Sequence, residues 1–98
     1  MILTIEIREG YGLRFRYPTA DDMRSAWMTK AKLAQAEDET AVLDEISGQL
    51  TKLLVGSTDQ AETVEELRTS GLLWGRTGVG LWFELYFRDL RAAGASNS

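Results

Sequence analysis

Alternating apolar and polar positions open the chain. Leu3, Ile5 and Ile7 fall on one face of an extended segment, and the same alternation resumes after the glycine-rich residues 10–12. Successive side chains of a strand point to opposite faces, so a period of two on both sides of a turn predicts a β-hairpin over residues 2–17. A lone hairpin is marginal in water. We therefore expect its apolar face to rest on helices, or its edge to pair with another chain.

Beyond the hairpin, apolar positions recur every three to four residues, which indicates amphipathic helices. Pro18 ends the second strand, and Thr19 is placed to cap the first helix. Thr63 and Glu66 have the capping-box spacing ahead of a later helix. Gly56 is expected to end the second helix in a left-handed turn. The predicted helices span about residues 20–36, 39–55, 63–70 and 75–92.

These elements predict one α+β domain, mainly α, in which an N-terminal β-hairpin is followed by three to four helices. The domain is expected to comprise residues 1–93, since a chain of 98 residues supports one core. The small and polar residues 94–98 predict a flexible tail. In the first helix, Met23, Trp27 and Ala34 share a face, so we expect Trp27 in the core.

The stretch from Leu72 to Leu90 is too apolar for an ordinary surface helix and holds most of the aromatic side chains. A helix that is apolar on most sides needs more than one partner, which can be other helices of the fold, a second copy or a client protein. The hairpin and the two amphipathic helices are expected to cover only part of it. The remaining aromatic residues then predict a protein-contact surface. Its members are Trp74, Trp82, Phe83, Tyr86 and Phe87.

The composition removes most catalytic chemistry. The chain has no cysteine and no histidine, so it lacks disulfides, thiol nucleophiles, the usual zinc sites and the commonest general base. Asp21 and Asp22, like Glu65 and Glu66, are adjacent, and adjacent side chains on a helix point about 100° apart. Neither pair is expected to hold a metal ion. The sequence therefore predicts a protein that is not an enzyme and has no cofactor or metal.

The glycines of residues 75–80 resemble a phosphate-binding loop, because glycine lets backbone amides approach an anion at the start of a helix. However, the preceding residues indicate a helix instead of a buried strand, and no Lys-Ser or Lys-Thr pair follows. The pattern therefore favours a helix start or close helix packing.

Charge narrows the possible partners. Eleven basic and 15 acidic residues give a formal net charge of −4, with no local basic cluster, which disfavours nucleic acid. Glu6, Arg8 and Glu9 lie where a signal peptide would be apolar, and Arg76 and Glu84 interrupt the longest apolar stretch. We expect no secretion and no membrane insertion, and we predict a cytoplasmic protein.

The order of these pieces resembles the tail assembly chaperones of long-tailed bacteriophages and prophages. The likeness rests on the segment RFRYPTADDM, residues 14–23, in which a strand, a proline and a Thr-Ala-Asp-Asp helix start follow one another. A TVEEL turn, residues 63–67, precedes the last apolar helix. The longer members carry a large C-terminal extension made by frameshifting, and the given sequence shows none. On this resemblance we expect either the short form of such a pair or a member of a single-form branch.

The resemblance implies a small, mainly helical protein that binds the tape measure protein and keeps its hydrophobic segments soluble. It also implies displacement as the tail tube protein polymerises, self-association into an oligomer, and no catalytic residues. Two alternatives remain open from the residues themselves. One is a small structural subunit of the virion, such as a connector. The other is an obligate homo-oligomeric module that buries the same apolar surface permanently.

Overall fold

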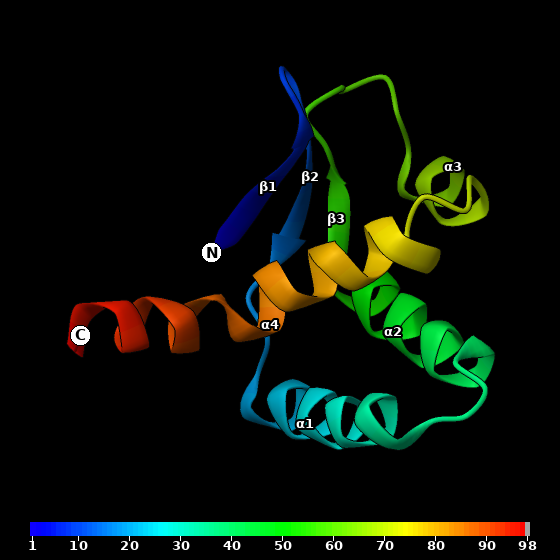
Figure 1. Cartoon of the computed structure of the whole chain (residues 1–98). Helices are drawn as coiled ribbons and strands as arrows, with labels where there is room; N and C mark the ends of the chain where they lie inside the picture. The colour runs from blue at the N-terminus through cyan, green and yellow to red at the C-terminus, as the bar shows by residue number, and fades with distance from the viewer. Residues whose placement is uncertain (98) are drawn as a thin grey trace.

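A computed structural model describes the backbone of residues 1–97 and the side chains of residues 1–87. The fold is α+β, with an N-terminal antiparallel hairpin followed by helices, as predicted. In Figure 1 the sheet lies at the top, α4 crosses it, and α1 lies at the bottom beneath α2 and α4. The elements in chain order are β1 (Ile2–Arg8), β2 (Tyr11–Arg16), α1 (Ala20–Gln35), α2 (Thr40–Leu53), β3 (Leu54–Ser57), α3 (Val64–Thr69) and α4 (Gly75–Asn97).

The sheet has three antiparallel strands in the order β1-β2-β3. β1 pairs with β2 so that Leu3 stands opposite Phe15 and Ile5 opposite Leu13. Leu13 and Phe15 are fully buried, because β2 is central in the sheet and its apolar face is covered by helices. The expected support of the hairpin by helices is therefore confirmed.

β3 is an element that sequence reasoning missed. The second helix was expected to continue to about residue 55, with Gly56 in a left-handed turn, and this expectation is wrong. The helix ends at Leu53, and the next residues are extended and pair with β2. The φ angle of Gly56 is not positive, and Gly56 pairs with Arg14 of β2. The free edge of β2 supplies the hydrogen-bonding partner that decides this conformation.

Two of the predicted caps form. The Thr19 hydroxyl oxygen accepts from the backbone N–H of Asp22 at 3.2 Å, and the Asp22 carboxylate accepts from the Thr19 N–H at 2.9 Å. This is a complete capping box at the start of α1. Thr63 caps α3 by accepting from the Glu66 N–H at 3.1 Å.

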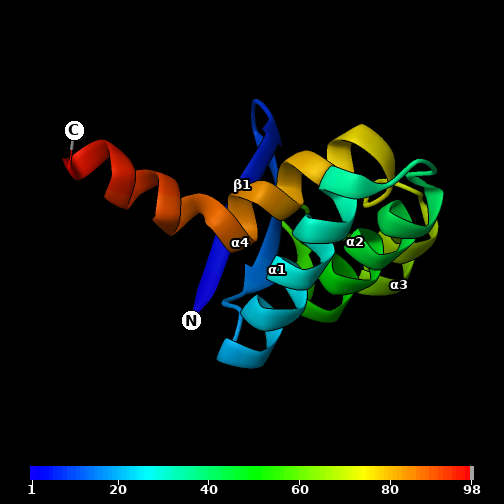
Figure 2. The ribbon, with the colours of Figure 1, turned by 60° about the horizontal axis from the view of Figure 1, so that its bottom comes forward.

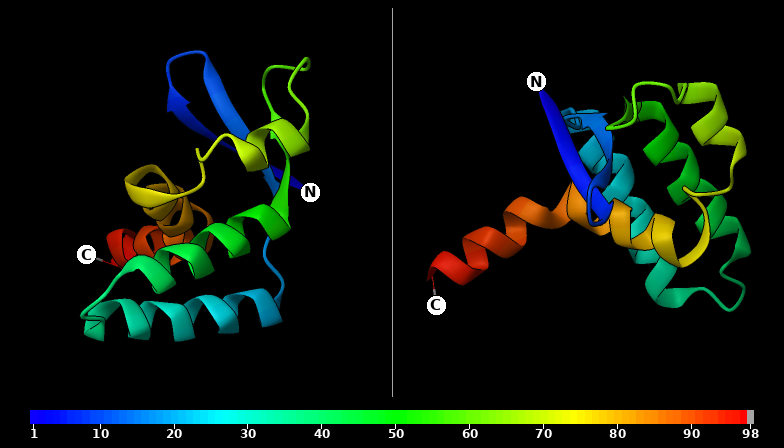
Figure 3. Two further views of the ribbon diagram at one scale, coloured as in Figure 1. Left: turned by 90° about the vertical axis from the view of Figure 1, so that its right-hand side faces the viewer. Right: turned by 90° about the horizontal axis from the view of Figure 1, so that it is seen from above.

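One hydrophobic core lies between the sheet, α2 and α4, as Figure 3 shows from two further sides. Burial of each large apolar side chain contributes roughly 1.5–3 kcal/mol relative to exposure. The most deeply buried members are Leu13, Phe15, Ile46, Leu50, Leu53, Leu67 and Trp82.

The glycine-rich segment starts α4, as favoured above. Gly75 has φ +77°, so the chain turns sharply there before the helix proceeds. A Cβ built on Gly78 would overlap the carbonyl oxygen of Leu73, because the chain entering the helix crosses directly beside it. The helix continues to Asn97, past the predicted end near residue 92, so most of the expected tail is helical. Ser98 lies outside the described residues.

Two glycines of α4, Gly78 and Gly80, provide a test of this entry geometry. Gly78→Ala is expected to lower the free energy of unfolding by more than about 2 kcal/mol, since backbone must move to admit the methyl group. A Cβ on Gly80 would meet no atom within 4 Å. Gly80→Ala is therefore expected to raise stability by up to about 1 kcal/mol through helix propensity. Urea denaturation of both variants measures the difference, and equal effects would contradict this geometry.

Candidate protein-contact surface

Helix α1 buries two polar residues and exposes two large apolar ones. Its buried residues are Asp22, Ala26 and Thr29, whereas Trp27 is 46% exposed and Met28 is 61% exposed. The expectation that Trp27 belongs to the core is therefore wrong. Single exposed apolar residues are common on protein surfaces. A buried carboxylate on the same helix as an exposed tryptophan is unusual, and it shows which side of α1 faces the rest of the fold. The rotation of α1 follows from the polar contacts on its inner face.

Asp22 anchors the first turn of α1 to α2 and β2. Its side chain is nearly inaccessible, and its carboxylate oxygens lie 2.8 Å from Lys52 Nζ and 3.6 Å from Arg16 Nη1. Burial by itself raises the pKa of Asp22. Hydrogen bonds from Lys52 and Thr19 outweigh that effect and lower the pKa from 3.8 to about 2. The carboxylate is therefore held ionised inside the fold.

Thr29 makes the second polar contact of this face. The Gln49 side-chain amide donates to the Thr29 hydroxyl oxygen at 2.7 Å, and that hydroxyl donates to the Ser25 carbonyl at 3.0 Å. Trp82 Nε1–H donates to the carbonyl oxygen of the same Gln49 side chain at 2.8 Å. One amide on α2 thus connects α4 with α1.

Three of the five predicted contact residues are core residues. Trp82 is fully buried, and Tyr86 and Phe87 are nearly so. The expectation that they face a partner is wrong, because α1, α2 and the sheet together cover more of α4 than the apolar pattern implied. The Trp82 and Phe87 rings pack edge to face with centroids 5.1 Å apart, a favoured geometry for aromatic pairs.

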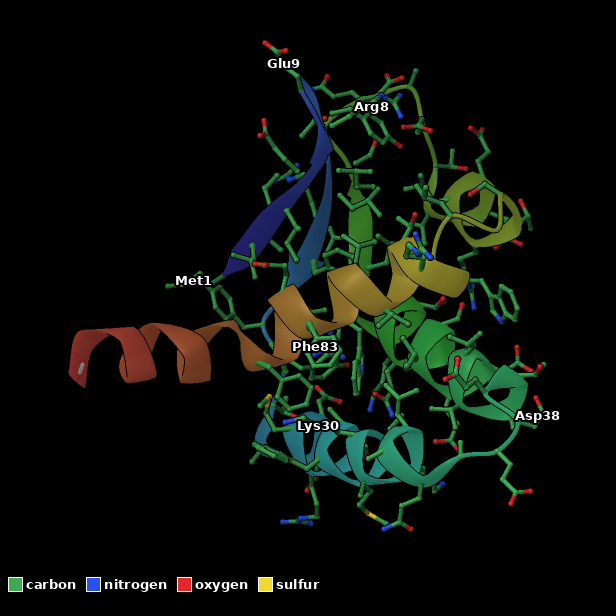
Figure 4. The ribbon with its side chains drawn as sticks, in the orientation of Figure 1. Met1, Arg8, Glu9, Lys30, Asp38 and Phe83 are labelled. Carbon is green, nitrogen blue, oxygen red and sulfur yellow. The ribbon has the colours of Figure 1, made fainter. Side chains whose placement is uncertain are left out.

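Phe83 and Trp27 lie where the aromatic cluster reaches the surface. Phe83 is half-buried, with its ring centroid 5.6 Å from that of Phe87, and Trp27 meets the other side of Phe87 at 5.2 Å. Lys30 Nζ lies 4.7 Å from the Trp27 ring centroid and 5.1 Å from that of Phe87. Figure 4 shows Phe83 and Lys30 in the space between α4 and α1. The contact role predicted for Phe83 stays a prediction.

Trp74 is separate from this cluster. It lies immediately before the first turn of α4, is 45% exposed, and donates from Nε1 to Asp44 Oδ1 at 2.8 Å. The structure therefore does not bring the five predicted residues together as one surface. Trp74 keeps an exposed ring face beside a hollow of about 440 Å³ lined by Tyr11 and Leu72 among others.

The strongest candidate surface is the outer side of α1. We define the α1 outer surface as Trp27, Met28, Ala31 and Ala34, which are all exposed and span about 120° of the helix. Trp27, near one margin, contacts Phe87, and Met28, at the other margin, lines the groove between α1 and α2. The exposed polar residues Arg24 and Gln35 lie on the same arc, and Arg24 pairs with Asp21 at 3.3 Å. Figure 2 shows α1 toward the viewer with no other element in front of it. Sequence reasoning missed it because Trp27 looked like a core residue.

The groove between α1 and α2 offers little to a ligand. Its volume is about 420 Å³, and its polar lining residues bond to one another, as Lys32 does to Glu45 at 2.9 Å. Among the described side chains, no buried polar atom lacks a hydrogen-bond partner. The same part of the chain holds no group of three or more acidic side chains arranged for a metal ion. No helix in the described chain has the length and apolar character needed to cross a membrane.

Comparisons of the chain with protein-family models, with curated proteins and with solved structures give no match. The candidate surface therefore stands on its geometry alone.

Asp22 is expected to be a strong contributor to stability. Asp22→Asn is predicted to lower the free energy of unfolding at pH 7 by about 2–3 kcal/mol, the range for buried hydrogen bonds to a charged group. Folding lowers this pKa. The ionised carboxylate therefore stabilises the fold above the ordinary pKa of 3.8, and the contribution is lost as pH falls through about 2. Denaturation at pH 7 and at low pH should show the mutant penalty shrinking in acid.

Asp21→Asn is the matched control for that test, since the neighbouring Asp21 carboxylate is exposed and pairs only at the surface. Its effect is expected to stay below about 1 kcal/mol. Equal penalties for the two aspartates would refute the anchoring role of Asp22.

Trp82 and Trp74 are predicted to respond differently to truncation. Trp82→Ala removes a fully buried side chain and is expected to destabilise the fold by about 3–5 kcal/mol. Trp74→Ala is expected to lose about 1 kcal/mol, chiefly the hydrogen bond to Asp44. Thermal and urea denaturation separate the two, and a stable Trp82→Ala protein would contradict the core assignment.

Proposed function

We propose that this protein binds an apolar or amphipathic helix of a partner protein on the α1 outer surface, as a tail assembly chaperone of a phage or prophage. The observation that carries the proposal is the exposure of Trp27 and Met28 on a helix that turns Asp22 and Thr29 inward. In this role the protein acts in the host cytoplasm, binds the tape measure protein and self-associates. The tail tube protein is then a second partner, and no reaction is catalysed.

The α1 outer surface has the shape that helix packing requires. Ala31 and Ala34 leave a shallow strip beside the large Trp27 side chain, so the ridge of a second helix can approach the α1 backbone. Met28 is unbranched and adapts to side chains of different shapes. A surface of this kind suits a holder that meets many apolar turns of one long helical client.

The charges of the chain also support a reversible holder. The net charge of −4 keeps a protein with exposed apolar residues soluble between binding events. Trp27 is fixed by its contacts with Phe87 and Lys30, so little side-chain freedom is lost when a client covers it.

Co-expression tests the client. A tape measure protein encoded beside this gene is expected to stay soluble with the wild-type chain and to precipitate with a Trp27→Ala, Met28→Ala double variant. The measured affinity should fall at least about fivefold, as for loss of an interface anchor. Trp74→Ala is the matched control, because it removes an equally exposed tryptophan from a different surface. Wild-type protein that leaves the client insoluble would refute the proposal.

The composition of purified particles distinguishes the chaperone from a virion subunit. A chaperone is expected to be absent from finished particles by mass spectrometry, whereas a connector subunit would be present in stoichiometric amount. Detection at that level would replace the proposed function with the structural alternative.

A further inference from the structure

The outer edge of β1 is an unpaired strand edge. β1 has seven residues and lies at one end of the sheet order, and within residues 1–97 no segment pairs with its outer side. β1 contains no proline and no lysine, and the features that can protect its edge, the charged Glu6 and Arg8 and a bulge between them, lie in its second half. An unpaired edge of this length is a template for another strand.

The hydrogen bonds of β2 show which groups of β1 face outward. The Gly12 N–H donates to Thr58 Oγ1 at 3.1 Å, and the Gly12 carbonyl accepts from the Thr58 N–H at 2.9 Å. The backbone of Gly12 therefore points away from β1. Glu6 stands opposite Gly12 in the antiparallel ladder, so the N–H and C=O of Glu6 point away from β2. By the same alternation, those of Thr4 also point outward.

We propose that a second copy of this chain pairs its own β1 antiparallel to this edge, with the two-fold axis at Ile5. Ile5 is the midpoint of β1, and this register aligns all seven residues of both strands. Thr4 of each copy then stands opposite Glu6 of the other, and both present outward-facing backbone groups. The two sheets become one continuous sheet of six strands.

Side chains are complementary in this register. Leu3 of one copy lies opposite Ile7 of the other on the apolar face, and Ile5 meets its own equivalent. On the polar face Glu6 meets Thr4, so no like charges stand opposite each other. Registers centred on Glu6 would place two carboxylates together, which destabilises a strand pair.

The apolar face of β1 is incompletely covered within one copy. Leu3 and Ile7 are only half-buried although Ile5 between them is buried, as expected for an apolar face that lacks a neighbour on one side. A groove of about 380 Å³ runs between β1 and α4, lined by Ile5, Ile7 and Leu81 among others. The bulge between Glu6 and Arg8 lies at the turn end and leaves the centre of the strand regular.

The second half of α4 extends on the same side as the free edge. Figure 1 and the right-hand view of Figure 3 show it projecting beyond β1, away from the rest of the molecule. A second copy at this edge would therefore lie next to the projecting helix. In Figure 1 the helix α1 lies at the bottom, apart from the outer edge of β1 at the upper left.

This inference rests on the self-association included in the proposed function, and its test is separate from client binding. Sedimentation of the wild-type chain is expected to show a dimer. Thr4→Pro removes an outward N–H while leaving the β1–β2 ladder intact, since proline is tolerated at an outer edge. It should raise the dimer dissociation constant at least about tenfold, while Thr4→Val, which keeps the N–H, should not.

Crosslinking decides the register even if Thr4→Pro fails to fold. The chain has no cysteine, so Thr4→Cys and Glu6→Cys proteins each carry one thiol. Mixed together, they should be joined efficiently by a short bis-maleimide, whose two ends each add one thiolate, because directly opposed Cβ atoms lie about 5 Å apart. Val55→Cys, exposed on the opposite edge strand β3, is the matched control and should not crosslink.

The outcomes separate the inference from the function that it deepens. The β1 interface is overturned if the wild-type chain is a dimer but the Thr4→Cys and Glu6→Cys proteins do not crosslink. It is also overturned if folded Thr4→Pro protein has the dimer dissociation constant of the wild type. Self-association itself stands in both cases. A monomeric wild-type chain overturns both self-association and the interface. If the wild-type chain dimerises and crosslinks as expected but does not bind the client, only the chaperone proposal is overturned.

Discussion

The hydrogen-bonded chain from Trp82 through Gln49 to Thr29 fixes the relation of three helices. A buried indole N–H needs an acceptor, and the Gln49 side chain supplies it from α2. The other end of that amide then needs an acceptor of its own, which Thr29 provides from α1. A polar group left buried without its partner would cost about 1–3 kcal/mol. The observed rotation of α1 satisfies these groups, and the Asp22 contacts favour the same rotation.

That rotation produces the apolar outer surface. Helix α1 has polar and apolar residues on both sides, and turning Asp22 and Thr29 inward leaves Trp27 and Met28 outward. The packing of α1 against α2 and β2 is therefore stabilised by the charge-assisted hydrogen bonds of Asp22 and not by complete burial of Trp27. A surface of this kind is available to a partner helix without unfolding any part of the core. The outer edge of β1 lies in a different part of the fold from α1.

Local signals in the sequence predicted the elements well and their partners less well. The alternation of Leu3, Ile5 and Ile7, and the caps at Thr19 and Thr63, depend on neighbouring residues and were recovered. β3 was missed because its four residues are extended only through pairing with β2, a contact distant in sequence. The aromatic surplus of the last helix correctly indicated several packing partners. The pattern did not indicate that those partners belong to the same chain.

The sequence by itself determined a single α+β chain without cysteine or histidine chemistry, its hairpin, and the starts of its helices. These features follow from period, capping and composition, which act over a few residues. Only the tertiary structure decided which faces are buried. Trp82, Tyr86 and Phe87 became core, and Trp27 became surface, because burial depends on where distant side chains such as Gln49 and Lys52 can satisfy buried polar groups. A residue's own hydrophobicity does not settle that choice.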